Sequence, residues 1–168
     1  GLRSFVASAN RPGVDFPVQN LPLAVFRPRR GAGTFRIGVG IGDLILDIGA
    51  VERCLPEVDS KAVQACREAS MQALMELGPE HWSRLRLGLS RLLREGTGFQ
   101  REVEPHLHAI ADVEFGLPLR IGNFSDYLAS MHHISKVIRV KRPDNPELPQ
   151  SFAWSPIAYH SRASTVRV

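Results

Sequence analysis

Cysteine is scarce in this chain of 168 residues, and its only two cysteines stand twelve positions apart. Cys54 and Cys66 lack the paired spacing of a zinc site or a redox motif, and two cysteines do not make the disulfide framework of a small secreted protein. We interpret both as small apolar residues on helical segments. Their scarcity favours a reducing, cytoplasmic location.

Long apolar runs are also missing. No stretch approaches the roughly 20 residues that a membrane-spanning helix needs. The first residues, "GLRSFVASANRPGVDF", contain no continuous apolar segment typical of a secretory signal. We therefore expect no membrane association. Because no initiator methionine is present, we also expect a start that is trimmed or missing.

Aromatic residues make up only 7% of the chain, while positive charge gathers near its end. Seven of the 21 Lys and Arg residues follow residue 118, but only three of the 17 Asp and Glu residues do. A local positive field suits an anionic ligand. The basic region has few aromatics for base stacking and no nucleic-acid-binding motif, so a small carboxylate is favoured over nucleic acid.

The first 118 residues show strand patterns followed by helical ones. "NLPLAVFRPR" contains a short apolar run that predicts a strand. "FRIGVG" and "LILDI" predict two further strands, joined by a tight hairpin at Gly42-Asp43. Helical periodicity over 60–78 and 79–96, separated at Gly78-Pro79, predicts a helical hairpin packed on the β unit.

Strand-like sequence returns at "HLHAIADVEFGLPLRIGNF", and "FGLP" marks a predicted boundary near residue 118. His106 and His108 have an i, i+2 spacing that can bind a metal from a strand. They lack an accompanying carboxylate or cysteine pattern, so we favour a structural role for them. The resulting fold class is mainly β with helices (α+β).

The richest segment is "SDYLASMHHISKVIRVKR", residues 125–142. A helix over 125–138 would place Asp126 and His133 on one face, with His132 about 100° away. A carboxylate and an imidazole that converge can bind a metal or activate water. Alternatively, the Asp126 carboxylate lies in the first turn and interacts favourably with the helix dipole, and His133 is a partly buried side chain with a structural role. Spacing alone leaves both readings open.

The remaining candidates follow this helix. Arg142 precedes Pro143, which favours extended backbone, and it either belongs to a solvated basic loop or binds a carboxylate. Tyr159, His160 and Arg162 precede a strand-like segment at 164–168. No nucleophile elbow is present.

Four segments together resemble the N-terminal part of the fumarylacetoacetase family. They are "DFPVQNLPLAVF", "RIGVGIGDLILDI", "IGNFSDYLASMHHISKVIRV" and "AYHSRAST", and they stand in family order. The resemblance implies an SH3-like barrel domain over residues 1–118. It also implies that residues 119–168 begin a β-rich catalytic roll, which would be truncated here.

The resemblance also implies roles for individual residues. Asp126 matches a calcium-binding carboxylate, and His133 matches the general base that takes a proton from the attacking water. Arg142 and Tyr159 match substrate-binding positions. Leu128 stands where the family usually has a substrate-contacting tyrosine, so one substrate hydrogen bond is in doubt.

The implied activity is hydrolysis of a carbon–carbon bond in 4-fumarylacetoacetate, giving fumarate and acetoacetate in tyrosine and phenylalanine catabolism. The implied cofactors are Ca²⁺ and Mg²⁺, and the implied assembly is a homodimer. Further metal ligands are expected beyond Val168, because calcium takes six to eight oxygens. We therefore expect a fragment of a protein more than twice as long, inactive alone. Alternatives are a related β-diketone or acylpyruvate hydrolase, or a non-catalytic SH3-like interaction module if the chain ends at Val168.

Overall fold

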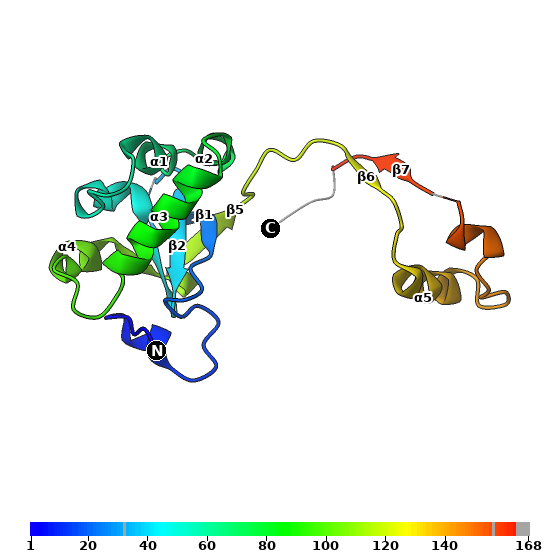
Figure 1. Cartoon of the computed structure of the whole chain (residues 1–168), viewed down its shortest axis with the longest axis horizontal. Helices are drawn as coiled ribbons and strands as arrows, with labels where there is room; N and C mark the ends of the chain where they lie inside the picture. Colours follow the sequence, from blue (N-terminus) through cyan, green and yellow to red (C-terminus); the bar gives the residue numbers. More distant parts are fainter. Residues whose placement is uncertain (32, 156, 164–168) are drawn as a thin grey trace. The chain divides into compact units, whose positions relative to one another are not determined.

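A computed structural model describes residues 1–31, 33–155 and 157–163, and it divides the chain into two compact units (Figure 1). The first unit runs from Gly1 to Arg120, and the second begins at Ile121. The strand-like segment predicted at 164–168 lies outside the described residues. The assignment of residues 119–168 to the start of a catalytic domain stays a prediction.

The first unit combines one sheet with several short helices, as the α+β prediction requires. Its strands are β1 (Leu23–Pro28), β2 (Arg36–Ile41), β3 (Leu44–Asp47), β4 (Leu107–Ala109) and β5 (Val113–Gly116). Its α-helices are α1 (Ser60–Ala65), α2 (Gln72–Glu76), α3 (Pro79–Leu92) and α4 (Gln100–Val103). Short 3-10 helices lie at Ala7–Asn10, Ile48–Cys54, Glu104–His106 and Ile110–Asp112.

The predicted hairpin between β2 and β3 is confirmed. Ile41 pairs with Leu44, which leaves Gly42 and Asp43 as a two-residue turn. Gly42 has a φ of 60°, a left-handed conformation that glycine adopts at little cost. The turn packs closely against the N-terminal segment, because a Cβ at Gly42 would lie 2.2 Å from the Ser8 hydroxyl oxygen. Glycine is therefore required here both for its conformation and for its size.

The five strands form one antiparallel sheet in the order β4-β3-β2-β1-β5, curled into a half-barrel. Its two edge strands are neighbours in sequence, joined only by Ile110–Asp112. Each end of this link is hydrogen-bonded to another part of the sheet. The Ile110 N–H donates to the carbonyl of Asp43 in the β2–β3 turn, and the Arg29 N–H, just after β1, donates to the Asp112 carbonyl. The short link thus brings the two edges of the curled sheet toward each other.

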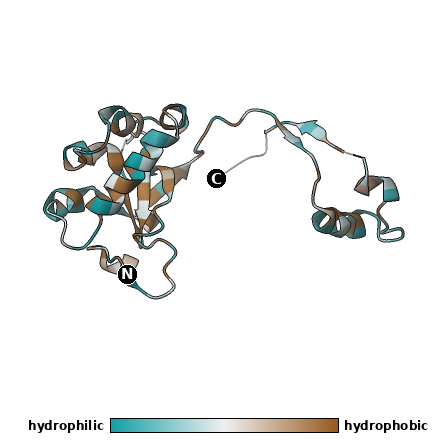
Figure 2. Cartoon of the chain, in the orientation of Figure 1, coloured by the Kyte–Doolittle hydropathy of each residue, from teal (hydrophilic) through white to brown (hydrophobic). Residues whose placement is uncertain are grey.

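Alternate residues of the strands enter two different cores, as the period of two in a β-strand requires. Val39 and Leu46 belong to the large cluster that α1, α2 and α3 cover, whereas Phe26 and Ile45 form a small cluster on the opposite face. Gly38 stands on that opposite face, where a Cβ would lie 2.6 Å from Phe26 Cε1. Figure 2 shows the brown strands behind α3, which carries both brown and teal turns. Burial on both faces explains why β2 reads as a continuous run of apolar residues and glycine.

The first arm of the predicted helical hairpin is wrong, because residues 60–78 form two short helices with a turn between them. The Cys66 carbonyl accepts a hydrogen bond from the Ile37 N–H of β2, and the Met71 N–H donates to the Pro118 carbonyl. These bonds to distant segments replace the bonds that would continue α1. Periodicity shows which residues are apolar, but it does not show that a backbone carbonyl is used by a strand.

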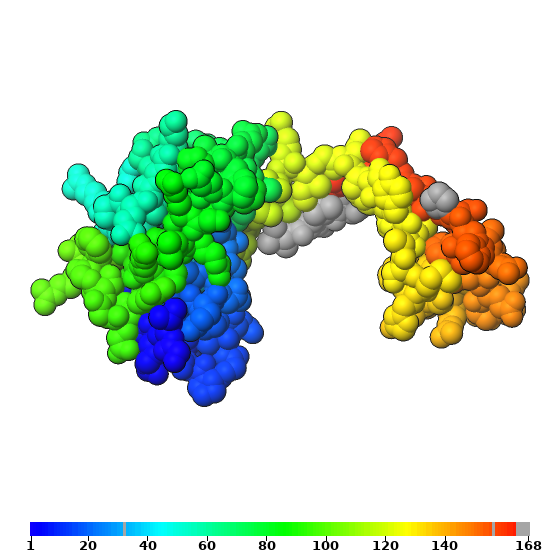
Figure 3. Space-filling model, viewed as in Figure 1, coloured from blue at the N-terminus to red at the C-terminus, as the bar shows by residue number. Residues whose placement is uncertain are grey.

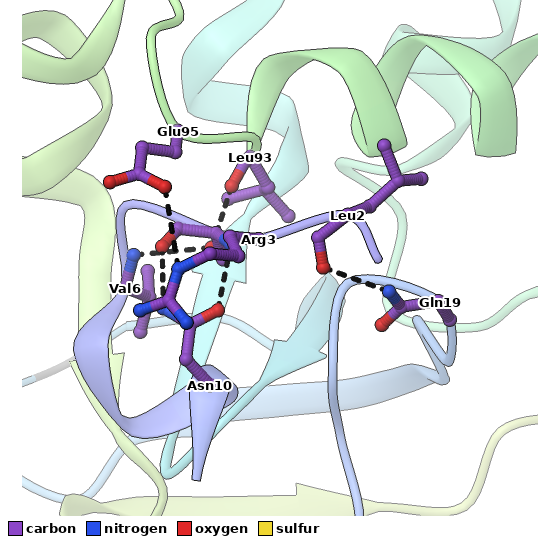
Figure 4. Close-up of polar contacts among 8 residues, drawn as sticks. Leu2, Arg3, Val6, Asn10, Gln19, Leu93 and Glu95 are labelled. Atoms are coloured by element: carbon purple, nitrogen blue, oxygen red, sulfur yellow. Dashed lines mark hydrogen bonds and ion pairs between the residues drawn. The ribbon is translucent and has the colours of Figure 1, made fainter.

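The second arm begins as predicted and ends earlier. Pro79 occupies the first turn of α3 after Gly78, whose φ is 88°. The helix ends at Leu92 instead of near Gly96, because the next residues bond to the N-terminal segment. Ser4 Oγ donates to the Leu93 carbonyl over 2.6 Å, and the Glu95 N–H donates to the Arg3 carbonyl. Figure 4 shows the Arg3 side chain beside the Glu95 carboxylate, with which it forms an ion pair. Figure 3 shows this blue N-terminal segment against the green segment that follows α3.

The second unit has little core of its own. It contains strands β6 (Phe124–Asp126) and β7 (Tyr159–Ser161), helix α5 (Met131–Lys141) and a 3-10 helix at Gln150–Ala153. None of its described residues, 121–155 and 157–163, is buried. Large apolar side chains such as Tyr127, Trp154 and Ile157 are exposed. This unit therefore has little apolar burial to stabilise it by itself.

A membrane-crossing segment was not expected. Among the helices of the described residues, none has the length and apolar character to cross a membrane.

Candidate functional site

Asp126 and Tyr159 come together across the β6–β7 ribbon. They are direct partners in the antiparallel register, 33 positions apart in the sequence. The Tyr159 hydroxyl donates a hydrogen bond to Asp126 Oδ2 over 3.0 Å, and the Leu128 N–H donates to Asp126 Oδ1 over 2.8 Å. Both carboxylate oxygens are therefore oriented by fixed donors.

These contacts stabilise the charged form of the carboxylate. The Leu128 N–H contributes most to lowering the pKa of Asp126, followed by the Tyr159 hydroxyl, and His133 contributes a smaller electrostatic part. The same hydrogen bond to Asp126 raises the pKa of Tyr159 above its ordinary value. The pair thus holds an anionic oxygen beside a neutral phenol at neutral pH.

The predicted helix over 125–138 is wrong at its start. Asp126 belongs to strand β6, and α5 begins only at Met131. Ser130 is the N-cap, and its Oγ accepts a hydrogen bond from the His133 N–H over 3.2 Å. The prediction that Asp126 and His133 share one helix face is therefore wrong. Serine is one of the preferred N-cap residues, so Ser130 is the sequence feature that could have predicted a helix start at Met131.

His133 lies in the first turn of α5, and its side chain is exposed. Its charge makes a small contribution to lowering the pKa of Asp126. His132 lines a separate hollow with Ser135, Lys136 and Arg139. His133 does not line that hollow. The two adjacent histidines are therefore presented to different surroundings, as helical geometry requires.

Arg142 is the C-cap of α5. Its N–H donates to the Ile138 carbonyl over 2.7 Å, and its φ of −136° takes the chain out of the helix before Pro143. Its neighbours Arg139 and Lys141 add positive charge to the last turn, where the helix dipole favours cations. The guanidinium is exposed at the point where the chain changes direction.

Leu128 has the only positive φ, 48°, among the non-glycine residues that the structure describes. No pattern in the sequence predicted this conformation. Leu128 lines a hollow of about 540 Å³ within the second unit, together with Met131, Phe152 and Trp154. An apolar hollow therefore adjoins the oriented carboxylate.

Sequence reasoning also missed a pairing beside Asp126. Ser125 Oγ and His160 Nδ1 lie 3.2 Å apart as register partners on β6 and β7. Side chains alternate between the two faces of a strand, so Asp126 does not share a face with Ser125. The pair thus lacks the Asp126 carboxylate as the third member of a catalytic triad.

The described residues offer only part of a metal site. Asp126 suits one position around a hard cation, because its carboxylate is anionic and retains lone pairs beyond its two hydrogen bonds. Across residues 1–31, 33–155 and 157–163, no three or more His, Cys, Asp or Glu side chains form a metal-binding group. A calcium ion needs six to eight oxygens, so this carboxylate fits as one ligand among others.

Comparison with known proteins identifies the class to which this arrangement belongs. The family described as "Fumarylacetoacetase N-terminal" matches residues 19–118, which cover the whole sheet of the first unit. The chain therefore belongs to the fumarylacetoacetase family, with its N-terminal domain in this region.

Curated relatives extend the similarity to nearly the whole chain. The fumarylacetoacetase of Caenorhabditis elegans is 32% identical over 99% of this chain. That of Oryza sativa subsp. japonica is 35% identical over 99%, and that of Homo sapiens is 32% identical over 92%. The chain spans about 40% of the length of these relatives.

Proposed function

We propose that the full-length protein containing this chain is a fumarylacetoacetase, which hydrolyses 4-fumarylacetoacetate to fumarate and acetoacetate. The observation that carries this proposal is the hydrogen bond between Asp126 and Tyr159. The family resemblance implies that Asp126 binds the metal and that Tyr159 binds the substrate. Their direct contact supports a shared site built on the β6–β7 ribbon.

Asp126 supplies a fixed anionic oxygen to this site. When bound, Ca²⁺ or Mg²⁺ would polarise the diketone oxygens and stabilise the departing enolate. Within the chain itself, the Leu128 N–H and the Tyr159 hydroxyl keep the carboxylate ionised and correctly oriented. Tyr159 is also positioned to donate to a substrate oxygen if the hydroxyl changes partner.

His133 is the proposed general base. A neutral imidazole accepts a proton from water, whose oxygen then adds to the carbonyl of the acyl group. The bond from that carbonyl carbon to the neighbouring methylene breaks, and its electron pair enters the acetoacetate enolate. Proton return to this carbon completes the reaction. Capping by Ser130 fixes the first turn of α5, from which His133 projects.

Arg142 is proposed to bind a substrate carboxylate. A guanidinium forms bidentate hydrogen bonds with a carboxylate, and the cations of the last turn of α5 attract an anionic substrate. The position of Arg142 outside the helix frees its side chain from the helix surface. This role is consistent with the excess of positive charge that follows residue 118.

The remaining metal ligands are proposed to come from polypeptide outside the described residues. Residues 119–168 would then begin a β-rich catalytic roll, and residues 1–118 would form an SH3-like barrel. The short 3-10 link between β4 and β5 supports the barrel proposal, because it brings opposite edges of the curled sheet together. A homodimer and a cytoplasmic location belong to the same proposal.

Steady-state kinetics of the full-length protein with His133→Ala tests the function. We expect kcat to fall about 10²- to 10⁴-fold with little change in KM, because a general base acts in the transition state. His132→Ala is the matched control and should keep nearly full activity. Equal losses in both variants, or a loss in the control alone, would contradict the role of His133. Absence of hydrolysis by the unmodified full-length protein with calcium would refute the function itself.

A further inference from the structure

The first unit contains a hollow of its own, formed by three separate segments. They are residues 54–58 at the end of the 3-10 helix Ile48–Cys54, the last two turns of α3, and residues 97–99 before α4. The volume of this hollow is about 170 Å³. A cavity of roughly 150 Å³ lined by Leu, Ile and Phe side chains is large enough to bind benzene. The hollow therefore has room for a single six-membered ring.

The floor of the hollow is apolar. Leu55, Val58 and Leu92 line it, and all three are buried members of the main core. Cys54 is also buried there, and desolvation, with a smaller effect of the Glu102 charge, raises the pKa of its thiol above 9.0. The thiol is therefore neutral at pH 7 and adds to the apolar surface. A hydrocarbon ring that entered the hollow would be stabilised by leaving water.

Close packing beneath the hollow maintains it. A Cβ at Gly88 of α3 would lie 2.5 Å from Val58 Cγ2 and 3.3 Å from Leu55 Cδ2. The helix and the 54–58 segment are therefore already in contact, and they cannot move closer together to fill the space. Gly98, in the third segment, has no side chain to occupy it, and a Cβ there would have no neighbour within 4 Å.

The rim of the hollow carries one ion pair and one aromatic ring. Among the described residues that line it, only Glu57 and Arg91 are charged, and Arg91 Nη1 donates a hydrogen bond to Glu57 Oε2. The ring is that of Phe99, which is 38% exposed and offers an edge or face to another ring. An anionic ligand would have to compete with Glu57 for Arg91 and would be repelled by it. A neutral hydroxyl group can instead donate to the free lone pairs of the Glu57 carboxylate.

We propose that this hollow is a further ligand site of the protein, and that it binds a neutral single-ring phenol. The ring lies on the apolar floor and packs against Phe99, and the hydroxyl donates to the Glu57 carboxylate. None of the residues that line the hollow has a role in the proposed hydrolysis. Binding measured without turnover therefore tests this site separately from the proposed function.

A titration of the ¹⁵N-labelled 168-residue chain followed by NMR tests the site. Phenol is the probe, with toluene and benzoate for comparison, at a pH of about 7 where phenol is neutral and benzoate is charged. We expect phenol to shift the amide signals of Gly88 and Gly98 with a Kd below about 1 mM, and to bind more tightly than benzoate. Gly78, which does not line the hollow, should not respond. Equal shifts at Gly78, or no saturation by about 10 mM phenol, would overturn the site.

Phe99→Ala tests the position of the ring. It should weaken phenol and toluene alike, by about three- to tenfold, because both lose an aromatic contact. Phe115→Ala is the matched control, since Phe115 is similarly exposed, at 36%, and does not line the hollow. It should leave both affinities unchanged. An equal loss in the two variants, or no loss in Phe99→Ala, would show that the ring does not bind here.

Glu57→Gln tests the hydroxyl contact. Phenol should weaken about three- to tenfold and toluene should stay within about twofold, because a neutral amide accepts a weaker hydrogen bond than a carboxylate does. Benzoate should bind more tightly, since Arg91 loses its anionic partner. Glu80→Gln is the matched control, because Glu80 and Arg84 form an exposed ion pair on the same helix outside the hollow. A phenol affinity that Glu57→Gln leaves within about twofold, or an equal loss in the control, would overturn the assigned hydroxyl contact and with it the preference for a phenol.

Discussion

Asp126 and Tyr159 are register partners whose side chains also meet, with the phenol hydroxyl 3.0 Å from Asp126 Oδ2. An ionised carboxylate offers about four lone-pair sites, and the Tyr159 and Leu128 donors use two of them. The remaining sites stay available to a cation. The pairing therefore aligns the carboxylate for a ligand without consuming its capacity to bind one.

Replacing Tyr159 by Phe should raise the pKa of Asp126. The unmodified residue should titrate below its ordinary value of 3.8, and the variant should titrate higher but still below 3.8, since the larger contribution, from the Leu128 N–H, remains. Carboxyl ¹³C chemical shifts measured against pH test this. Tyr127→Phe should leave the titration unchanged; an equal shift there would contradict the assignment.

The sign of the linked stability follows from the lowered pKa. The Asp126 contacts favour the folded ribbon fully above pH 3.8, and this contribution is lost as the pH falls through the lower folded-state pKa. For Tyr159 the pKa is raised, so the contribution is present below pH 10 and is lost as the pH rises through the higher value.

Cys66 should be inert toward thiol reagents while the first unit is folded. Burial, with a smaller effect of the Asp47 charge, raises its pKa from 9.0 to about 12, so at pH 8 the thiolate fraction is about 10⁻⁴. A disulfide reagent applied to the Cys54→Ser variant should react at the rate of unfolding and rapidly in denaturant. Fast reaction of the folded variant at pH 8 would contradict the buried position.

Gly38→Ala should destabilise the first unit by about 1–3 kcal/mol, because the new methyl group overpacks the small core. Its Cβ would lie 2.6 Å from Phe26 Cε1, 2.7 Å from Ile45 Cγ1 and 2.8 Å from the Leu46 carbonyl oxygen. Urea denaturation measures the effect. Gly98→Ala is the control, with no neighbour within 4 Å, and should stay within about 0.5 kcal/mol. Equal stability of both variants would disprove the tight packing.

The 168-residue chain alone should bind calcium no more tightly than millimolar and should not hydrolyse 4-fumarylacetoacetate. One carboxylate cannot replace the six to eight oxygens of a calcium site. Titration calorimetry tests the binding, with Asp126→Asn as the control for any weak heat. Micromolar affinity that disappears in this variant would show that the chain holds a complete site.

The sequence predicted the features that depend on local patterns. The β2–β3 hairpin followed from the apolar strands around Gly42-Asp43, and the break before α3 followed from Gly78-Pro79. The sequence did not predict the turn after Cys66, because its cause is a hydrogen bond from Ile37, far away in the chain. A local sequence pattern cannot show which distant backbone N–H will donate a hydrogen bond to a given carbonyl.

For the candidate site, the family resemblance supplied the residues and the helical pattern misplaced them. Periodicity extended α5 back to residue 125, although Ser130 caps it and Asp126 lies in β6. A three-residue strand carries almost no periodic signal, and its formation depends on β7, more than 30 residues later. The contact between Asp126 and Tyr159 was therefore outside the reach of local reasoning.

The pairing of β1 with β5 has a consequence for synthesis on the ribosome. Pro28 is paired with Val113, so 85 further residues must be synthesised after Pro28 before its partner in β5 is present. At about 5–20 residues per second, this interval is on the order of ten seconds. During that time the nascent chain exposes an unpaired apolar strand edge, which is open to wrong pairing and to chaperones. Slower translation before residue 113 should therefore increase misfolding more than slower translation after it.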